Sequence, residues 1–423
     1  MHSEMTTLSN GLRIISSYRP ELETVSVGAW VKTGAAQEKK SINGISHFVE
    51  HMVFKGTATR TLEDISDQIE NAGGQINAYT AREFTAFYAR MLKDDAELAL
   101  DVIADMLQHP SFPQSELDKE RDVVIQEIKQ GRDTPDEVVF DYMQECAFPG
   151  QGLGSNILGP EANIRRFTRE DLYSYLESNY AAENIVVCAV GNITHEKFVQ
   201  YAAARFSELR PRVSFVSEPQ RYIGGFKVEK RDIEQAHVAV AFESYPYYNN
   251  KYFAAMLLSN VMGGGTSSRL FREIRDKRGL VYSVYSFANS HTGSGLFGVY
   301  AGTTAGELPT LMPVLCDEID KVCSEKVTPQ ELHRAQVQMK SAVLMSMESS
   351  ASVAEILARQ QLIYDRIIPV EEMVEEIEAV TADDIMNAAQ HIFVTPPSYA
   401  LVGAFDGHMS YDELAERFRV KNA

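Results

Sequence analysis

The sequence contains few cysteines and none of the patterns in which cysteine organises a fold. Its four cysteines, Cys146, Cys188, Cys316 and Cys323, are dispersed along the chain and form no CxxC pair. Neither a disulfide scaffold nor a thiolate zinc site is therefore indicated. We expect these residues to be reduced and to lie in the core of a protein from a cytoplasmic-type compartment.

Long apolar segments and an excess of cations are also missing. No apolar run reaches about 18 residues, and the opening MHSEMTTLSNGLRIISSYRP has no basic segment followed by an apolar one. We therefore expect no signal peptide, no membrane span and a cytoplasmic location. The net charge of −19 argues against nucleic acid as a partner, because phosphate binding requires clustered cations. An acidic surface favours cationic peptides instead.

The length of the chain indicates more than one domain. It has 423 residues, of which 44% are hydrophobic, and this is too much apolar material for one comfortable core. The most polar, proline-containing connection in mid-chain is ELRPRVSFVSEPQRYIGG, residues 208–225. The sequence therefore predicts an N-terminal domain over residues 1–207, a linker over 208–225 and a C-terminal domain over 226–423.

The two halves resemble one another. ETVSVGAWVKTG, from Glu23, and AHVAVAFESYPY, from Ala236, both alternate as strands do, and an apolar helix is expected after each. Further along, each half has a helix, a proline-containing turn and a second helix that begins near Ser115 or Thr328. The sequence therefore predicts two copies of one α+β unit.

The segment GISHFVEHMVFKGT, residues 44–57, places His47 and His51 four residues apart, with Glu50 between them. On a helix these two histidines lie on one face, roughly 6 Å apart, so they can share one small cation. Two imidazoles suit zinc, and a carboxylate beside the metal can take a proton from an attacking water. The motif predicts a zinc hydrolase; the alternative is a core helix that happens to contain two histidines.

The second copy of the unit helps to decide between these interpretations. When Ser46 is aligned with Ser259, His47 falls on Asn260 and His51 falls on Gly264. If histidine were simply a good core residue at these positions, we would expect the second copy to retain at least one. The core interpretation is thereby weakened.

A catalytic zinc needs a third protein ligand. SELDKERDVVIQEIKQ, residues 115–130, places Glu120 and Glu127 two helical turns apart and hence on one face. Alone, such acids would be solvated helix charges. The second copy has Ala335 and Ala342 at these positions, so the copy that lacks the two histidines also lacks the two glutamates. This correlation makes the two glutamates candidates for the metal site.

Over nearly its whole length the chain resembles the inverzincin metallopeptidases, the family of pitrilysin, insulysin and the mitochondrial processing peptidase, and is most similar to short members such as the processing peptidase β subunit. The resemblance implies one zinc ion per chain, held by His47, His51 and Glu127, the last 76 residues after His51. It also implies that Glu50 is the general base and that Glu120 orients a histidine. The implied fold has two homologous α/β-sandwich domains, with antiparallel-rich sheets, forming half of a clamshell.

GGQINAYTAREFTAFYARM, residues 73–91, resembles the edge strand on which these peptidases bind substrate. The resemblance implies that Asn77, Ala78 and Tyr79 pair their main chain with that of an extended peptide, which gives affinity without demanding a particular sequence. Without the resemblance, this segment is an ordinary hairpin strand.

Two further pairs carry implied substrate contacts. DEVVFDYM, residues 136–143, resembles an acidic pair, here Glu137 and Asp141, that binds an arginine near the cut; the alternative is solvated helix charges. GGGTSSRLFREIRDKRGLVYSV, residues 263–284, resembles the stretch in which an arginine and a tyrosine, here Arg275 and Tyr282, bind the substrate backbone and stabilise an oxyanion; the alternative is a solvated basic helix.

Together these features predict a zinc endopeptidase that cuts extended, unfolded and preferably basic peptides. Because one chain carries both the zinc motif and the Arg275/Tyr282 pair, a homodimer is the simplest assembly. One alternative is a non-enzymatic assembly protein, like the respiratory-complex core proteins of this fold, but such relatives typically lose a ligand or the base. A hydrolase of non-peptide esters or amides is another, but it leaves the peptide-binding strand unexplained.

Overall fold

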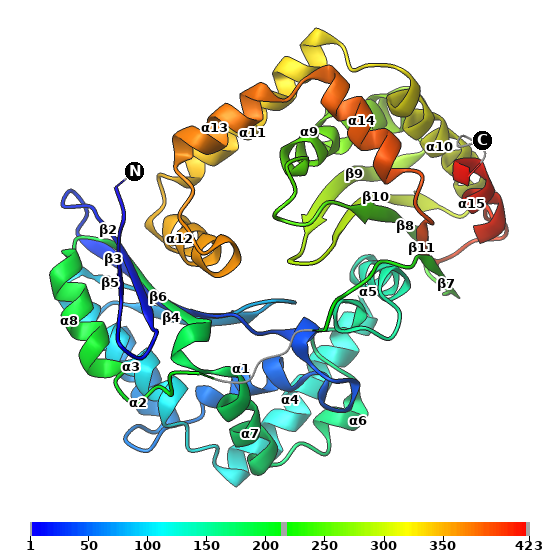
Figure 1. Cartoon of the computed structure of the whole chain (residues 1–423). Coiled ribbons are helices and arrows are strands. Elements are labelled where there is room, and N and C mark those ends of the chain that lie inside the picture. Colours follow the sequence, from blue (N-terminus) through cyan, green and yellow to red (C-terminus); the bar gives the residue numbers. More distant parts are fainter. Residues whose placement is uncertain (1, 213–217, 420–423) are drawn as a thin grey trace. The chain divides into compact units, whose positions relative to one another are not determined.

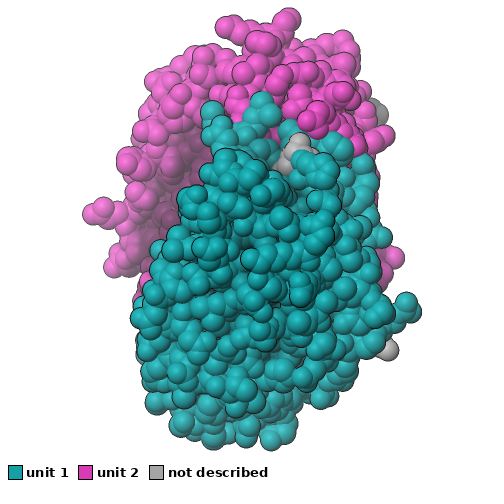
Figure 2. All heavy atoms as spheres, turned by 90° about the vertical axis from the view of Figure 1, so that its left-hand side faces the viewer, with its two compact units in different colours: residues 1–128, 156–218, 344–370 teal, residues 129–155, 219–343, 371–423 magenta. Residues whose placement is uncertain are grey.

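The computed structural model describes residues 2–212 and 218–419 (Figure 1). The chain forms two compact units, which Figure 2 colours separately. Unit 1 comprises Met1–Ile128, Asn156–Glu218 and Leu344–Val370, and unit 2 comprises Lys129–Ser155, Pro219–Val343 and Glu371–Ala423. Residues 213–217 of the predicted linker lie outside the described residues. Within the described ranges, no helix has the length and apolar character needed to cross a membrane.

Unit 1 is built on a six-stranded sheet with the order β1-β2-β6-β3-β5-β4. Its strands are β1 (Glu4–Thr7), β2 (Arg13–Tyr18), β3 (Thr24–Val31), β4 (Gln75–Thr80), β5 (Thr85–Leu92) and β6 (Ile185–Gly191). Only β2 and β6 pair in parallel, and the other neighbours are antiparallel. The helices that belong chiefly to this unit are α1 (Ile45–Val53), α2 (Leu62–Asn71), α3 (Ala96–Gln108), α4 (Gln114–Arg132), α6 (Glu161–Ile164), α7 (Arg169–Asn179), α8 (His195–Arg205) and α12 (Ser350–Tyr364).

Unit 2 repeats this design with a five-stranded sheet in the order β7-β11-β8-β10-β9. Its strands are β7 (Gly225–Lys230), β8 (Gln235–Ser244), β9 (Val281–Ser290), β10 (Gly295–Thr304) and β11 (Ser398–Gly403). The parallel pair is β7 and β11, in the same place as β2 and β6. Its helices are α5 (Pro135–Ala147), α9 (Tyr252–Gly263), α10 (Leu308–Ser324), α11 (Pro329–Ser346), α13 (Val370–Ala379), α14 (Ala382–Ile392) and α15 (Tyr411–Arg419). The predicted α+β class with two homologous sandwich units is confirmed.

The compact units do not coincide with the predicted sequence halves, because each unit takes one helix from the other half. Helix α5 precedes residue 208 but packs on β11, β8 and β7 of unit 2. Helix α12 follows residue 225 but packs on β6 and β3 of unit 1. Each sheet therefore has helices on both faces; in unit 1, Figure 1 shows α12 on one face and α1, α3 and α8 on the other.

This arrangement explains the burial of β3. Its sequence alternates, but every residue after Thr24 is buried. One face, which includes Val27 and Ala29, packs into the main core with α1 and α3. The opposite face carries Ser26 and Trp30 beneath α12. The hydroxyl groups of Ser26 and Ser350, the first residue of α12, are 2.9 Å apart and hydrogen-bonded.

A buried carboxylate and a glycine fix the start of α1. Gly44 precedes the helix with φ +98°, a conformation that favours glycine, and a Cβ there would lie 2.6 Å from the carbonyl oxygen of Leu158. The carboxylate of Glu38 accepts hydrogen bonds from the backbone N–H groups of Gly44 and Ser46, both at 2.7 Å. These bonds satisfy N–H groups that a helix leaves unpaired at its start.

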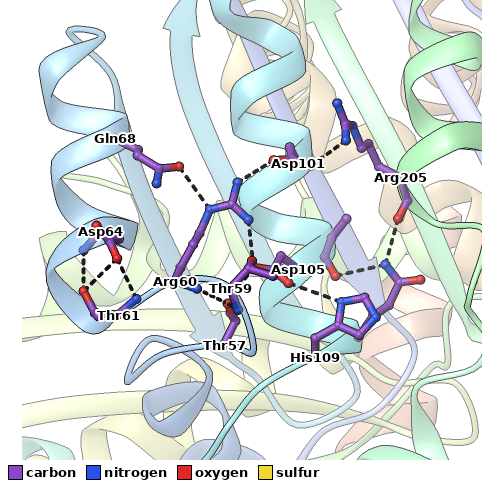
Figure 3. A network of polar contacts seen from close by, with 12 residues as sticks. Thr57, Thr59, Arg60, Thr61, Asp64, Gln68, Asp101, Asp105, His109 and Arg205 are labelled. Atoms are coloured by element: carbon purple, nitrogen blue, oxygen red, sulfur yellow. Dashed lines mark hydrogen bonds and ion pairs between the residues drawn. The ribbon is translucent and has the colours of Figure 1, made fainter.

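A polar network anchors the loop that follows α1 (Figure 3). The buried carboxylate of Asp105, on α3, accepts hydrogen bonds from Thr57 Oγ1 at 2.6 Å, Thr59 Oγ1 at 2.8 Å and Arg60 Nη1 at 2.7 Å. Arg60 also binds Asp101. Both ends of α1 are thus tied to the surrounding core, so the helix cannot slide along its axis without breaking buried polar contacts.

The charges in this network are mutually stabilised. Burial alone would raise the pKa of Asp105, but the hydrogen bonds from Thr57, Thr59 and Arg60 outweigh it and lower the pKa below the ordinary value of 3.8. Burial alone would lower the pKa of His109, but its bonds with Glu208 and Asp105 outweigh burial and raise it. Asp105 therefore stabilises the fold most at a pH above 3.8, and this contribution is lost as the pH falls through its lowered pKa.

Asp105→Asn is expected to lower the free energy of unfolding at pH 7 by about 2–4 kcal/mol, because Arg60 and two hydroxyl groups lose a buried anionic acceptor. Urea denaturation at pH 7 measures this difference, which should narrow as Asp105 becomes protonated in the wild type at a pH below 3.8. Asp118→Asn, which removes an exposed carboxylate paired with Arg121 on α4, is the matched control and should change stability by less than about 0.5 kcal/mol. Equal effects of the two substitutions would contradict the assigned role of Asp105.

Candidate metal centre

Helices α1 and α4 bring His47, His51 and Glu127 together. The Nε2 atoms of the two histidines are 3.2 Å apart, and Glu127 Oε2 lies 3.7 Å from Nε2 of His47 and 3.6 Å from Nε2 of His51. In the part of the chain that the structure describes, these residues form the one group of three or more whose donor atoms could hold a metal ion. Helical spacing explains the arrangement, because the histidines lie one turn apart on α1 and face α4.

The residues fit a zinc ion. Zinc binds imidazole nitrogen and carboxylate oxygen at about 2.0–2.2 Å, and a tetrahedral site of that size separates neighbouring ligand atoms by about 3.3–3.6 Å. The three observed separations lie close to this range. Glu127 Oε2 is also buried and has no hydrogen-bond partner among the described residues. A buried anionic oxygen without a partner is costly, and a cation between the three side chains would satisfy it.

A second carboxylate orients His51. Glu120 Oε1 accepts a hydrogen bond from Nδ1 of His51 at 2.8 Å, so the proton lies on Nδ1 and the lone pair of Nε2 is directed to the cluster. The other oxygen of Glu120 binds the ammonium group of Lys55, also at 2.8 Å. Burial alone would raise the pKa of Glu120, but His51 and Lys55 outweigh it and keep this pKa below its ordinary value.

The two histidines differ in their electrostatic surroundings. Burial, with the charge of a protonated His51, lowers the pKa of His47 to about 3, so this imidazole is neutral and able to donate a lone pair. For His51, burial alone would lower the pKa, but the hydrogen bond to Glu120 and the charge of Glu127 raise it. Binding of a cation at Nε2 must therefore displace any proton held there.

Glu50 lies on the same helix and points to the sheet. Its Oε2 accepts a hydrogen bond of 2.5 Å from the hydroxyl group of Thr80, the last residue of β4. Burial raises the pKa of Glu50 above its ordinary value, and the hydrogen bond from Thr80 only partly offsets this. A partly buried carboxylate with a raised pKa, next to candidate metal ligands, is a better proton acceptor than an ordinary surface carboxylate.

Strand β4 carries Asn77, Ala78 and Tyr79 at the end of the sheet. It pairs with β5 on one side, and in the described chain no strand pairs with its other side. Ala78 packs against the core, and the side chains of Asn77 and Tyr79 lie on the opposite face. The predicted edge position of this strand is confirmed, and its outer backbone groups can accept another strand.

Arg275 and Tyr282 are brought together within unit 2. The Arg275 guanidinium, on a π-helical turn (Phe271–Asp276), lies 5.6 Å from the centre of the Tyr282 ring and 4.8 Å from that of Phe271. Tyr282, on the edge strand β9, has 77% of its surface exposed. A cation stacked on an exposed phenol presents two hydrogen-bond donors to the solvent side.

Glu137 and Asp141 lie one turn apart on α5, as predicted for a helical pair. Glu137 is exposed and Asp141 is partly buried, while Val138 and Val139 of the same helix are buried. Both acids belong to unit 2, whereas the candidate ligands belong to unit 1. Their role therefore stays a prediction.

Sequence reasoning did not identify three residues that support the site: Glu38, Lys55 and Thr80. Lys55 belongs to the FKGT segment directly after the motif, and Thr80 directly follows the predicted peptide-binding residues. Their positions in the sequence were a usable signal, but their partners, Glu120 and Glu50, could be assigned only from the packing of α1 against α4 and β4. Glu38 gave no such signal, because its bonds depend on a turn of irregular backbone.

Comparison with known proteins agrees with this geometry. Residues 13–161 match the model of the insulinase family, peptidase family M16, and residues 166–339 match that of the peptidase M16 inactive domain. An uncharacterized zinc protease of Rickettsia felis is 37% identical over 95% of this chain and 98% of its own. A probable mitochondrial-processing peptidase subunit beta of Arabidopsis thaliana is 33% identical over 98% of this chain and 81% of its own.

The fold is also found in solved structures. A protease from Helicobacter pylori superimposes with a TM-score of 0.89 at 20% sequence identity, over 95% of this chain and 99% of that one. The predicted relationship to the short inverzincins is confirmed by the family matches and by relatives named as zinc proteases over nearly their full length. The chain belongs to the insulinase family of metallopeptidases, peptidase family M16.

Proposed function

We propose that the protein is a zinc-dependent endopeptidase that cleaves extended peptides. The observation that carries this proposal is the hydrogen bond between Thr80 and Glu50. It joins the last residue of a free edge strand to the candidate base, beside the candidate metal ligands. A peptide that adds as a further strand to β4 would therefore run alongside the group that must activate water.

Each residue of the centre has a distinct role in the proposal. His47, His51 and Glu127 hold one zinc ion per chain, which supplies a Lewis acid and lowers the pKa of water to about 7. Glu50 accepts the proton of the attacking water and delivers it to the leaving amine. Glu120 fixes the orientation of His51, and Asn77, Ala78 and Tyr79 align the substrate backbone.

Arg275 and Tyr282 would stabilise the negative charge that develops on the scissile carbonyl oxygen. We propose that they act on the zinc centre of a second copy. The resemblance described above implies that one chain forms half of a clamshell, so a second copy would supply the other half. A two-fold homodimer would then have two equivalent sites, each with zinc from one chain and the Arg275/Tyr282 pair from the other.

The substrates proposed are unfolded, basic peptides with an arginine near the cut, bound by Glu137 and Asp141. A pair of carboxylates can hold a guanidinium through two parallel hydrogen bonds. The chain's net charge of −19 favours cationic substrates in general. Buried thiols at Cys146, Cys188 and Cys316 support a reducing, cytoplasmic-type location.

Glu50→Gln is expected to retain zinc but lose turnover by a factor of about 10²–10⁴, because an amide cannot accept a proton from water. Glu127→Gln is expected to weaken zinc binding itself, because it replaces an anionic ligand. Metal analysis after dialysis and peptide cleavage assays separate the two effects, and a chelator should abolish wild-type activity. Wild-type protein that cleaves peptides without bound zinc would contradict the proposal. Equal zinc loss in Glu50→Gln and Glu127→Gln would show that the roles of base and ligand are exchanged.

Reversal of both acids, Glu137→Lys with Asp141→Lys, is expected to suppress cuts next to arginine more than cuts in neutral peptides. The cause is charge repulsion, and zinc chemistry should be unaffected. Mass spectrometry of cuts in a mixed peptide library, with wild type and variant at equal zinc content, measures the change. Glu145→Lys, at an exposed acid on the same helix, is the matched control. If the double variant cuts the library at the same positions as the control, Glu137 and Asp141 do not bind the arginine of the substrate and are ordinary helix charges.

Mixing Glu50→Gln protein with Arg275→Ala protein, each inactive alone, is expected to restore activity after the subunits exchange. A mixed dimer has one site in which both Glu50 and Arg275 are intact. With random reassortment about half of the dimers are mixed, so about a quarter of wild-type activity should return. If subunit exchange is demonstrated with differently tagged chains and activity stays absent, the composite site is wrong.

A further inference from the structure

A row of three residues crosses unit 1 beneath α12. Trp30 on β3 is paired with Ala86 on β5, and Ala86 is paired with Tyr79 on β4. Paired residues point to the same face of a sheet, and adjacent strands are about 4.8 Å apart, so Trp30 and Tyr79 flank Ala86 about 10 Å from each other. The small central side chain leaves space between the two aromatic residues.

Glu355 of α12 occupies this position. Its Oε2 accepts a hydrogen bond from Nε1 of Trp30 at 2.6 Å, and its Oε1 accepts one from the hydroxyl group of Tyr79. One carboxylate therefore bridges an inner strand of the sheet and its edge strand. Each of its oxygens has a different donor, so rotation of the carboxylate would break both bonds.

The sheet is shaped to receive this contact. A Cβ at Gly28, two residues before Trp30 on the same face, would lie 2.8 Å from Cη2 and Cζ3 of the indole, so the ring can lie along β3 only because glycine is there. Trp30 is 2% exposed. Its indole N–H needs an acceptor in this buried setting, and Glu355 is the group that provides it.

Burial and the negative charge of Glu355 both raise the pKa of Tyr79, so its hydroxyl group keeps its proton and remains a donor. Arg359, one turn further along α12, lies 3.7 Å from Glu355 Oε1 and contributes a positive charge near it. Hydrogen bonds to an ionised acceptor are about twice as strong as those between neutral groups. The contact is thus strong enough to restrain the edge of a sheet.

Strand β4 is consequently held on both faces by consecutive residues. Tyr79 binds Glu355 on the α12 side, and Thr80 binds Glu50 on the α1 side. Its inner edge is paired with β5, and its outer edge is the one proposed to receive a peptide. Edge strands are otherwise the parts of a sheet most prone to fray, because only one side is hydrogen-bonded.

We infer that Glu355 is a positioning residue for peptide binding: by bridging Trp30 and Tyr79 it holds β4 in the extended, rigid form that an incoming peptide must pair with. The inference rests on the proposed function, because it assigns the binding strand of that site. A rigid strand lowers the entropy that is lost when the peptide binds. Loss of Glu355 should therefore weaken substrate binding and leave the zinc centre intact.

The first test uses backbone hydrogen exchange of the zinc-loaded protein without peptide. Glu355→Gln replaces the anionic acceptor with a neutral amide, whose oxygen can accept from Trp30 and whose nitrogen can only donate to Tyr79. Because the charge-assisted bonds are lost, exchange in residues 75–80 should be about tenfold faster than in the wild type, while β2 and β6 keep their protection. Tyr79→Phe, a milder change, should produce part of the same effect. Glu348→Gln, at an exposed acid just before α12, and Tyr88→Phe, on the neighbouring strand, are the controls.

The second test is kinetic. For a peptide that the wild type cleaves, Glu355→Gln should raise KM about tenfold with kcat within about twofold and with zinc content unchanged. The double variant with Tyr79→Phe should show less than the sum of the two single effects in free energy, because both remove the same bridge. The emission of Trp30, the chain's only tryptophan, should shift in Glu355→Gln and stay unchanged in Glu348→Gln.

Two results would overturn the inference. One is exchange in residues 75–80 that matches the Glu348→Gln control; the other is a loss of kcat or zinc at unchanged KM, which would place the effect of Glu355 at the metal centre. A wild-type protein that cleaves no peptide would instead defeat the proposed function, and the exchange experiment would still decide whether Glu355 holds the strand.

Discussion

The candidate metal centre depends on the hydrogen bond between His51 and Glu120. By holding a proton on Nδ1 of His51, Glu120 directs the Nε2 lone pair to the point that His47 and Glu127 also face. Glu120 can do this only as an anion, and it remains one, although buried, because Lys55 neutralises its second oxygen. Lys55 in turn lies at the start of the loop that Asp105 anchors. The orientation of one imidazole therefore rests on buried charges that extend from α4 through the loop to α3.

The second unit shows what the same fold does without this chemistry. The position aligned with Glu50 is Gly263, at the end of α9, and a Cβ there would lie 2.1 Å from the backbone nitrogen of Ser286 on β9. In unit 1 the equivalent helix keeps a carboxylate directed to β4, and Thr80 binds it. In unit 2 glycine allows the helix to lie directly against the edge strand. Close backbone packing in unit 2 thus takes the place of the hydrogen bond that holds Glu50 in unit 1.

Local spacing was enough to predict much of this architecture. The alternating segments became β3 and β8, the paired helices begin at Gln114 and Pro329, and His47 and His51 face one another as helical geometry requires. Spacing alone left Glu120 and Glu127 as candidates, and the family resemblance implied that Glu127, which joins the two histidines from α4, is the third ligand. Residues whose partners are distant in the sequence could not be predicted in this way. Thr80 is 30 residues from Glu50, and Tyr79 is 276 residues from Glu355, so no local period relates the members of either pair. Arg275 and Glu137 belong to unit 2 and the candidate metal ligands belong to unit 1, so helical spacing could not predict a shared role for them either.

Dividing the sequence at residues 208–225 does not predict that α5 belongs to unit 2 and α12 to unit 1. An alternating strand predicts one buried face, yet β3 is buried on both, because α12 arrives from the second half to cover the other. Without α12, Trp30 would lose both its cover and the carboxylate that accepts its indole N–H, and Tyr79 would lose its hydrogen bond to Glu355. The N-terminal half of the sequence is therefore not a self-contained structural unit. Its ligands are local, but the strand proposed to bind substrate is held by a side chain that the second half supplies.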